Sequence, residues 1–390
     1  MEGDFIKINE WLLPLSWIYG IGVKFRNFLF DVGVLKSHAY TVPIISVGNI
    51  TVGGTGKTPH VEYLIRLLKD ELNIAVVSRG YKRKSSGFVL ANAETTMKMI
   101  GDEPYQMKQK FPGITVAVDG NRNRAIQQLT SGNSGNKEID VILLDDAFQH
   151  RYVKPGINIL LVDYHRLIIY DKLMPAGRLR EQMKGKNRAD IVIVTKCPKE
   201  LKPMEYRVIT KAMGLFPYQK LFFTTLTYEP LRPVFGKSRG AAPQLDQQNV
   251  LLVTGIASPR QMTEDLTPQV KSLQTIIFSD HHNFNRKDIS RINETFEAMP
   301  SPKLIVTTEK DAARLTAVEG LSDEVRQHLY LLPIRISFMQ DQEESFNQNI
   351  IAYVRKNSRN SILAKRKDDH KSKDGHSPGD RPRTISFRNY

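Results

Sequence analysis

The chain has a single cysteine and no long hydrophobic run. Among its 390 residues Cys197 stands alone, which excludes an intramolecular disulfide and fits a reducing compartment. We interpret its thiol as buried. The longest early uncharged run, from Trp11 to Val23, is shorter than the ~20 apolar residues that a bilayer-spanning helix needs. Acidic residues, Glu2 and Asp4, stand where a secretory signal would be basic, so no signal peptide is predicted.

Acidic residues are few relative to basic ones. The chain has 41 Asp and Glu against 56 Lys and Arg, a net charge of +15. Residues 355–390 hold eleven Lys or Arg and four Asp or Glu, so this tail carries +7 and leaves +8 for the rest. A basic surface suits nucleic acid, an anionic membrane or phosphorylated substrates. No nucleic-acid-binding motif is found, so no nucleic acid partner is expected.

Residues 1–40 form an aromatic, apolar leader segment. Its apolar residues recur at helical spacing, and cations lie between them: Trp11, Leu15, Ile18, Phe25 and Leu29, with Lys24 and Arg26. Such a helix can lie in a membrane interface, and we interpret residues 1–40 as a membrane-associating helical segment. A helix packed on its own domain gives the same pattern, and the pattern alone leaves both interpretations open.

Residues 41–228 alternate short β-rich runs with helical patterns. The predicted strands are Val42–Val47, Ile74–Val77, Ile114–Val118, Ile139–Leu144, Ile157–Val162 and Ile191–Val194. One helix shows a clean apolar stripe: Val61, Leu64, Ile65 and Leu68. This alternation predicts an α/β fold in which a mostly parallel sheet carries helices on both faces.

The rest of the chain divides into three parts. Residues 229–248 are rich in Pro and Gly and are interpreted as a linker. Residues 249–354 predict a second, smaller α/β unit with strands near Val250–Val253, Leu273–Phe278, Leu304–Val306 and Tyr330–Leu332. Residues 355–390 have few apolar residues and are interpreted as a basic disordered tail.

The segment from Ser46 to Thr58 follows a predicted strand and precedes a predicted helix, as a phosphate-binding P-loop requires. Its candidate nucleotide-binding residues are Gly53, Gly54, Thr55, Gly56, Lys57 and Thr58. Glycines let backbone N–H groups converge on phosphate oxygens, Lys57 reaches the β- and γ-phosphates, and Thr58 supplies a hydroxyl to Mg²⁺. The motif usually begins with Gly, where this chain has Thr51. The pattern predicts a P-loop NTPase-type domain.

The strand at Ile139–Leu144 is followed by two carboxylates, Asp145 and Asp146. In P-loop folds an acid at such a strand end holds Mg²⁺ beside the P-loop threonine. Paired acids also cap turns. Because a P-loop lies upstream, we favour the metal-binding interpretation.

Seven segments occur together in one order: Ser46–Thr58, Gly101–Pro104, Asp145–Arg151, Leu173–Glu181, Thr195–Cys197, Ser279–His282 and Thr308–Asp311. The ordered set resembles the tetraacyldisaccharide 4'-kinase family, the lipid A 4'-kinases, over residues 10–340. The resemblance implies transfer of phosphate from ATP, with Mg²⁺, to the 4'-hydroxyl of a tetraacyl disaccharide 1-phosphate in lipid A biosynthesis. It further implies two α/β/α units joined by a two-stranded linker, and a peripheral position on the cytoplasmic face of the bacterial inner membrane, whose surface is anionic.

The resemblance implies that Asp102 is the general base and that His281 pairs with it. A helix cap for Asp102 and a surface turn for His281 are the alternatives when each motif stands alone. Arg180 follows a Pro-Gly turn and is a candidate to neutralise the transferring phosphoryl group or to bind the substrate's phosphate. Glu181 is a candidate to hold Mg²⁺ or to orient Arg180, and Gln149 to contact nucleotide or sugar.

Two other kinds of NTPase compete with this interpretation. In a P-loop GTPase or ATPase switch, Thr195-Lys196 would begin a guanine-reading loop, but Pro198 stands where that loop usually has Asp. A nucleic-acid-associated ATPase would explain the basic charge, although much of that charge lies in the tail. Both would hydrolyse nucleotide without an acylated disaccharide acceptor, which distinguishes them from a kinase.

Overall fold

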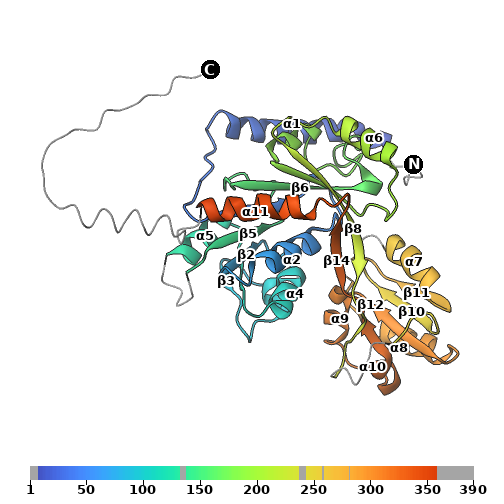
Figure 1. Ribbon diagram of the computed structural model, residues 1–390. Coiled ribbons are helices and arrows are strands. Elements are labelled where there is room, and N and C mark those ends of the chain that lie inside the picture. Colours follow the sequence, from blue (N-terminus) through green and yellow to red (C-terminus); the bar gives the residue numbers. More distant parts are fainter. Residues whose placement is uncertain (1–7, 132–137, 237–242, 257–258, 281, 358–390) are drawn as a thin grey trace, which may run out of the picture.

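The computed structural model describes residues 8–131, 138–236, 243–256, 259–280 and 282–357. These residues form a large and a small α/β unit (Figure 1). His281 and residues 358–390 of the predicted tail lie outside the described residues. The tail was expected to begin at residue 355, but residues 355–357 are the end of a helix.

Within the described residues the large sheet has nine strands in the order β14-β8-β7-β6-β1-β5-β2-β4-β3. They are β1 (Ile44–Gly48), β2 (Ile74–Ser78), β3 (Val89–Leu90), β4 (Thr115–Val118), β5 (Val141–Asp145), β6 (Ile157–Asp163), β7 (Ile191–Thr195), β8 (Lys220–Tyr228) and β14 (Ile334–Phe338). Only the edge strands β3 and β14 pair antiparallel. The predicted mostly parallel sheet is confirmed.

Helices cover both faces of the large sheet. They are α1 (Leu13–Asp31), α2 (Lys57–Leu68), α3 (Met97–Ile100), α4 (Asp102–Lys110), α5 (Arg122–Thr130), α6 (Pro203–Met213) and α11 (Glu343–Asn357), with 3-10 turns at Glu10–Leu12, Tyr164–Arg166 and Met183–Arg188. The predicted stripe of α2 is buried in one core together with residues of α4 and α11. Residues of α5 and α6 belong to the cores on the opposite side. Burial on both faces explains why the central strands are continuously apolar.

The small unit has a five-stranded sheet in the order β11-β10-β12-β13-β9. Its strands are β9 (Arg232–Pro233), β10 (Asn249–Thr254), β11 (Ser272–Ile277), β12 (Lys303–Thr307) and β13 (Leu329–Leu331). Its helices are α7 (Arg260–Leu266), α8 (Arg286–Glu297), α9 (Glu309–Leu315) and α10 (Asp323–His328), with a 3-10 turn at Thr267–Gln269. The four predicted strands of this unit are each found within two residues of their expected bounds.

The expected boundary of the small unit at residue 354 needs correction. After β13 the chain returns to the large unit, where β14 pairs with β8 and α11 buries Phe346, Ile350 and Val354 in the large core. The two strands β8 and β14 therefore link the units, as Figure 1 shows. The resemblance implied such a two-stranded linker, but its strands were not located in the sequence, because their pairing joins segments far apart and leaves no local signal.

The expected linker at 229–248 also needs refinement. Part of it, β9, pairs with β13 and so belongs to the small sheet. Cys197 is fully buried just after β7, as predicted.

Helix α1 confirms the helical spacing of the leader segment and has two unlike sides. Its large exposed apolar residues, with those just before and after it, are Trp11, Leu15, Trp17, Ile18, Ile21, Phe25, Phe28 and Val32. Its other side packs on the large unit through Ser16, Gly20 and Phe30, which are buried. In the part of the chain that the structure describes, no helix is long and apolar enough to cross a bilayer.

Candidate active site

The predicted P-loop lies between β1 and α2, with Lys57 and Thr58 as the first two residues of the helix. Gly53 and Gly56 have φ of 116° and 83°, a backbone conformation that favours glycine. Asn49 Nδ2 donates to Thr55 Oγ1 at 2.9 Å, and Thr195 Oγ1 donates to the Thr55 carbonyl at 3.0 Å. These bonds fix Thr55 to the residue that follows β1 and to the last residue of β7.

Thr51, which replaces the first glycine of the motif, is buried and forms an antiparallel bridge with Leu179. On either side of it, Val52 N donates to the Arg178 carbonyl and Arg180 N to the Ile50 carbonyl, both at 2.8 Å. The start of the P-loop is thus paired with the segment that follows the predicted Pro-Gly turn. This pairing places Arg180 beside the phosphate loop.

The two strand-end carboxylates differ in environment. Asp145 is buried at the end of β5, and its Oδ2 accepts from Ser78 Oγ at 3.2 Å, while Oδ1 has no hydrogen-bond partner in the described structure. Burial, followed by the charges of Glu103 and Asp146, raises the pKa of Asp145 to about 7. Asp146 lies 3.7 Å from Lys57 Nζ and 3.4 Å from Arg180 Nη1. Asp146 therefore lies between the two cations predicted to act on phosphate.

The oxygen donors at this strand end suit Mg²⁺. Among the described residues no group of three or more His, Cys, Asp or Glu is placed to chelate a metal directly. Mg²⁺ commonly keeps several waters and binds one or two carboxylates together with substrate phosphates. Asp145, with its unpartnered buried oxygen, ends β5 directly before Asp146, which lines the same cavity as Thr58, and this set of oxygen donors fits such a site.

Glu181 and Gln149, also candidates, contact each other. Gln149 Nε2 lies 3.2 Å from Glu181 Oε1, and Arg188 Nη2 lies 2.8 Å from Glu181 Oε2. Glu181 is buried. Its carboxylate is thus held in place immediately after Arg180.

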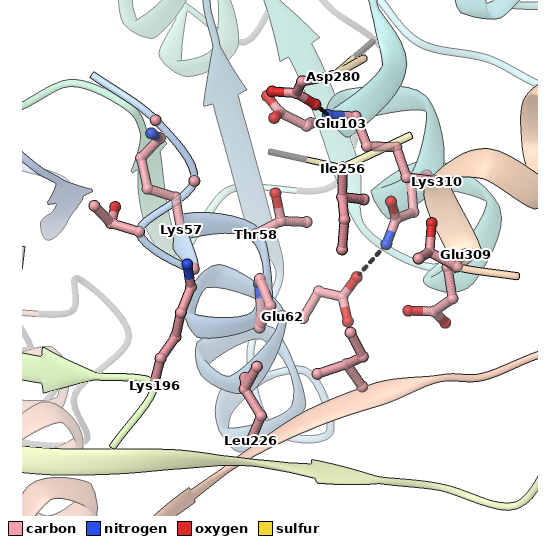
Figure 2. Close-up of a pocket in the computed structure, with 18 of the residues that line it drawn as sticks. Lys57, Thr58, Glu62, Glu103, Lys196, Leu226, Ile256, Asp280, Glu309 and Lys310 are labelled. Carbon is pink, nitrogen blue, oxygen red and sulfur yellow. Dashed lines mark hydrogen bonds and ion pairs between the residues drawn. The ribbon is translucent and has the colours of Figure 1, made fainter. Parts of the chain in front are cut away.

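A cavity of about 430 Å³ opens at the P-loop. Figure 2 shows Lys57, Thr58 and Lys196 on one side of it and Ile256, Glu309 and Lys310 on the other. One wall therefore comes from the large unit and the other from the small unit. Lys196 was not assigned as a site residue, although it belongs to the Thr195–Cys197 segment of the family pattern.

A second cavity, of about 550 Å³, lies between α1 and the strand ends. Tyr19 and Arg26 of α1 line it, together with Arg79, Arg122 and Gln149. Gln149 lines this cavity rather than the P-loop cavity. Burial, followed by the charges of Arg122, Arg26 and Arg79, lowers the pKa of His150, another lining residue, to about 4. The second cavity is thus lined by four arginines and three acidic residues, and its histidine is neutral at neutral pH.

The two cavities meet. Four residues line both of them: Tyr81, Glu103, Asp146 and Arg180. A group bound at the P-loop and a group bound beneath α1 would approach each other at Asp146 and Arg180. This arrangement suits transfer between two bound molecules.

Asp102 is the first residue of α4, and its carboxylate forms an ion pair with Arg314 of α9. Its predicted partner His281 lies outside the described residues. The preceding residue, Asp280, lines the P-loop cavity and lies 3.3 Å from Lys310 Nζ. Arg314 was missed by sequence reasoning, although it stands three residues after Asp311, at the spacing of one helical face.

Comparisons with known proteins agree with the geometry. The sequence profile of the family described as Tetraacyldisaccharide-1-P 4'-kinase matches residues 8–355. The chain is 57% identical over 366 residues to the Tetraacyldisaccharide 4'-kinase of Phocaeicola vulgatus, covering 93% of this chain and 99% of that one. It is 52% identical over 382 residues to the enzyme of that name from Bacteroides thetaiotaomicron, covering 95% and 100%.

A solved structure of the same family also resembles this protein. The crystal structure of LpxK from Aquifex aeolicus in complex with ATP superposes with a TM-score of 0.66 at 30% identity, covering 88% of this chain and 98% of that one. Sequence and fold agree over nearly the whole length. The chain belongs to the tetraacyldisaccharide 4'-kinase family.

Proposed function

We propose that this protein transfers the γ-phosphate of ATP to the 4'-hydroxyl of a tetraacyl disaccharide 1-phosphate, a step of lipid A biosynthesis. The observation that carries the proposal is the meeting of the two cavities at Asp146 and Arg180. One cavity contains a P-loop, and the other lies under an apolar helix and is lined by arginines. Family membership and the names of the relatives support the same assignment.

On the nucleotide side, the residues Gly53–Gly56 would bind phosphate through backbone N–H groups, with Lys57 on the β- and γ-phosphates. Thr58, Asp145, Asp146 and Glu181 would hold Mg²⁺, which neutralises phosphate charge when bound. Arg180, beside Asp146, would meet the negative charge of the transferring group.

On the acceptor side, the arginines of the second cavity would bind the phosphate that the acceptor already carries, and Gln149 would contact the sugar or the nucleotide. Asp102 would accept the proton of the attacking hydroxyl, and His281 would orient it. A sugar alcohol is a weak nucleophile, so a base beside it aids attack on the γ-phosphate.

We further propose that α1 lies on the anionic cytoplasmic face of the bacterial inner membrane. Its aromatic side is exposed, while its other side contacts the catalytic segments: Tyr19 Oη donates to the Arg180 carbonyl at 2.7 Å, and Arg26 Nη2 to the Gln149 carbonyl at 3.2 Å. The second cavity would therefore open close to the bilayer, where an acylated acceptor keeps its acyl chains in lipid.

The full-length protein is tested with ATP, Mg²⁺ and a tetraacyl disaccharide 1-phosphate in mixed micelles. The expected product has gained one phosphate at the 4' position, identified by mass spectrometry, and its formation matches ADP release. Nucleotide turnover that is unchanged by leaving out the acceptor, with no phosphorylated lipid, would refute the kinase assignment in favour of an NTPase switch.

Membrane binding is tested by flotation with vesicles that contain anionic lipid. Trp17 and Ile21 are 70% and 69% exposed and contribute nothing to the core, so Trp17→Asp with Ile21→Asp is expected to keep the fold and abolish flotation. Flotation that survives this change but is lost when residues 358–390 are removed would assign the membrane contact to the tail.

A further inference from the structure

Helices α4 and α9 pack together where the small unit meets the large one (Figure 1). They carry an ion pair at each end of the contact. Asp102, at the start of α4, pairs with Arg314 near the end of α9, and Lys110, at the end of α4, lies 2.7 Å from Glu309 at the start of α9. The reversed order of the pairs shows that the two helices run antiparallel. Asp102 and Lys110 are eight positions apart on α4, which corresponds to about 12 Å along the helix axis.

The two pairs differ in what they touch. Lys110 also lies 2.6 Å from the buried carboxylate of Glu62 on α2. Glu62 and Glu309 line the P-loop cavity, but neither is assigned a part in transfer. Arg314 contacts Asp102, which the proposed function assigns as the base. One end of the contact thus joins helices, while the other end contacts the proposed base.

Arg314 is unusually well held for an arginine. Its side chain is 5% exposed, and its Nη1 lies 3.4 Å from Asp311 Oδ1. The Asp311 carboxylate is fully buried and is fixed in the small unit by the backbone N–H of Gly255 at 2.9 Å and the hydroxyl of Thr308 at 2.7 Å. A rigid anchor in the small unit therefore directs the guanidinium across the interface onto Asp102.

We propose that Arg314 is a positioning residue, which holds the Asp102 carboxylate in its reactive orientation only while the small unit is docked on α4. The inference rests on the proposed function, because it needs Asp102 to act as the base. A planar guanidinium fixes the orientation of a carboxylate in a way that the single point charge of lysine does not. Correct placement of the base would then depend on closure of the nucleotide cavity, whose second wall belongs to the same unit as Arg314.

The test is a double-mutant cycle on the full-length protein, with kcat and KM measured separately for ATP and the acceptor. Arg314→Gln is expected to lower kcat on the order of 10²-fold, since a small displacement of a catalytic group costs about that much. KM for ATP should stay within about twofold of wild type, because the P-loop is untouched. In the Asp102→Asn background Arg314→Gln should cause no further loss, since groups that act as a unit are non-additive.

Lys110→Gln is the matched control, because it removes the ion pair at the other end of the same contact. If both pairs only dock the units, Lys110→Gln and Arg314→Gln will have equal effects on kcat, and the inference is overturned. It is also overturned if the losses from Arg314→Gln and Asp102→Asn multiply. Arg314→Lys, which keeps the charge near Asp311, serves in the same cycle if Arg314→Gln does not fold.

If the proposed function itself is wrong, the same experiment gives a different result. In that case the wild-type protein would not phosphorylate the acceptor at all. An active wild type whose kcat is insensitive to Arg314→Lys and Arg314→Gln would refute only the positioning role.

Discussion

The two walls of the P-loop cavity are built in opposite ways. In the wall of the large unit one continuous segment, Val52–Pro59, supplies eight lining residues, and its backbone is fixed by positive-φ glycines and by bonds from Asn49 and Thr195. The wall of the small unit is assembled from separate segments around Ile256, Met262, Asp280 and Thr308–Lys310. The phosphate-binding wall is thus preformed, while the facing wall depends on how the small unit docks.

This difference has consequences for mutation. Changes in the preformed wall should remove chemistry and leave docking intact. Changes in the facing wall should alter nucleotide binding and leave the phosphate-binding residues intact. The following predictions separate these two classes, from the largest expected effect to the smallest.

Lys57→Ala is expected to reduce phosphoryl transfer below detection, because it removes the cation that we propose meets the β- and γ-phosphates. The fold should survive, since the pair with Asp146 at 3.7 Å is partly exposed and such pairs contribute at most about 1 kcal/mol. Turnover and melting temperature are measured together. Lys69→Ala, at the other end of α2 and exposed, is the control. Near-normal transfer by folded Lys57→Ala protein would contradict the assignment of this wall.

Asp102→Asn is expected to lower kcat by about 10²–10⁴-fold, the usual contribution of a general base. ATP binding, measured by calorimetry, should be unchanged because the P-loop is intact. Adding His281→Ala should slow the enzyme scarcely further if the two residues act as a unit. Losses that multiply in this pair would mean that the two side chains act independently.

Gln261→Leu probes the facing wall. In the described structure the Gln261 Oε1 is buried without a hydrogen-bond partner, and the residue lines the P-loop cavity from α7. An amide oxygen in that position can accept from the amino group of adenine. Loss of one such bond costs about 1 kcal/mol, so KM for ATP should rise about fivefold while kcat stays constant. A fall in kcat with no change in KM would place Gln261 outside nucleotide binding.

The thiol of Cys197 should not react with alkylating reagents in the folded protein. Burial raises the pKa of its thiol to about 12, so the reactive thiolate is almost absent at neutral pH. We expect no alkylation by iodoacetamide at pH 7.5 until denaturant is added, and then one label per chain. Labelling in native buffer would contradict the burial of Cys197 in the core of the large unit.

The preformed wall was predictable from a local pattern, whereas the facing wall was reached only through the family resemblance, whose segments Ser279–His282 and Thr308–Asp311 supply Asp280 and Thr308–Lys310. Strand, glycines, Lys57 and Thr58 lie within one short segment, so local pattern identified them, and Asp145 and Asp146 followed from their place at a strand end. Arg314 contributes to the site only through packing of α9 on α4. No local rule connects it with Asp102, which lies far away in sequence.

The same limit applies to the fold. The central strands were predictable as apolar runs, because both faces of a parallel sheet are buried. Strand β14 and helix α11 were missed because what defines them is pairing with β8 and packing on the large core. Thr51 was expected as a departure from the P-loop pattern, and only the structure shows that its backbone pairs with Leu179.

The return of β14 to β8 has a consequence for synthesis on the ribosome. Until residues 334–338 emerge, β8 is an unpaired edge of the large sheet, and the core face that α11 covers is open to solvent. The small unit is encoded entirely between these two strands and can fold first. The nascent chain therefore passes through an intermediate with a finished small unit and an incomplete large one, which is when a holding chaperone would matter most.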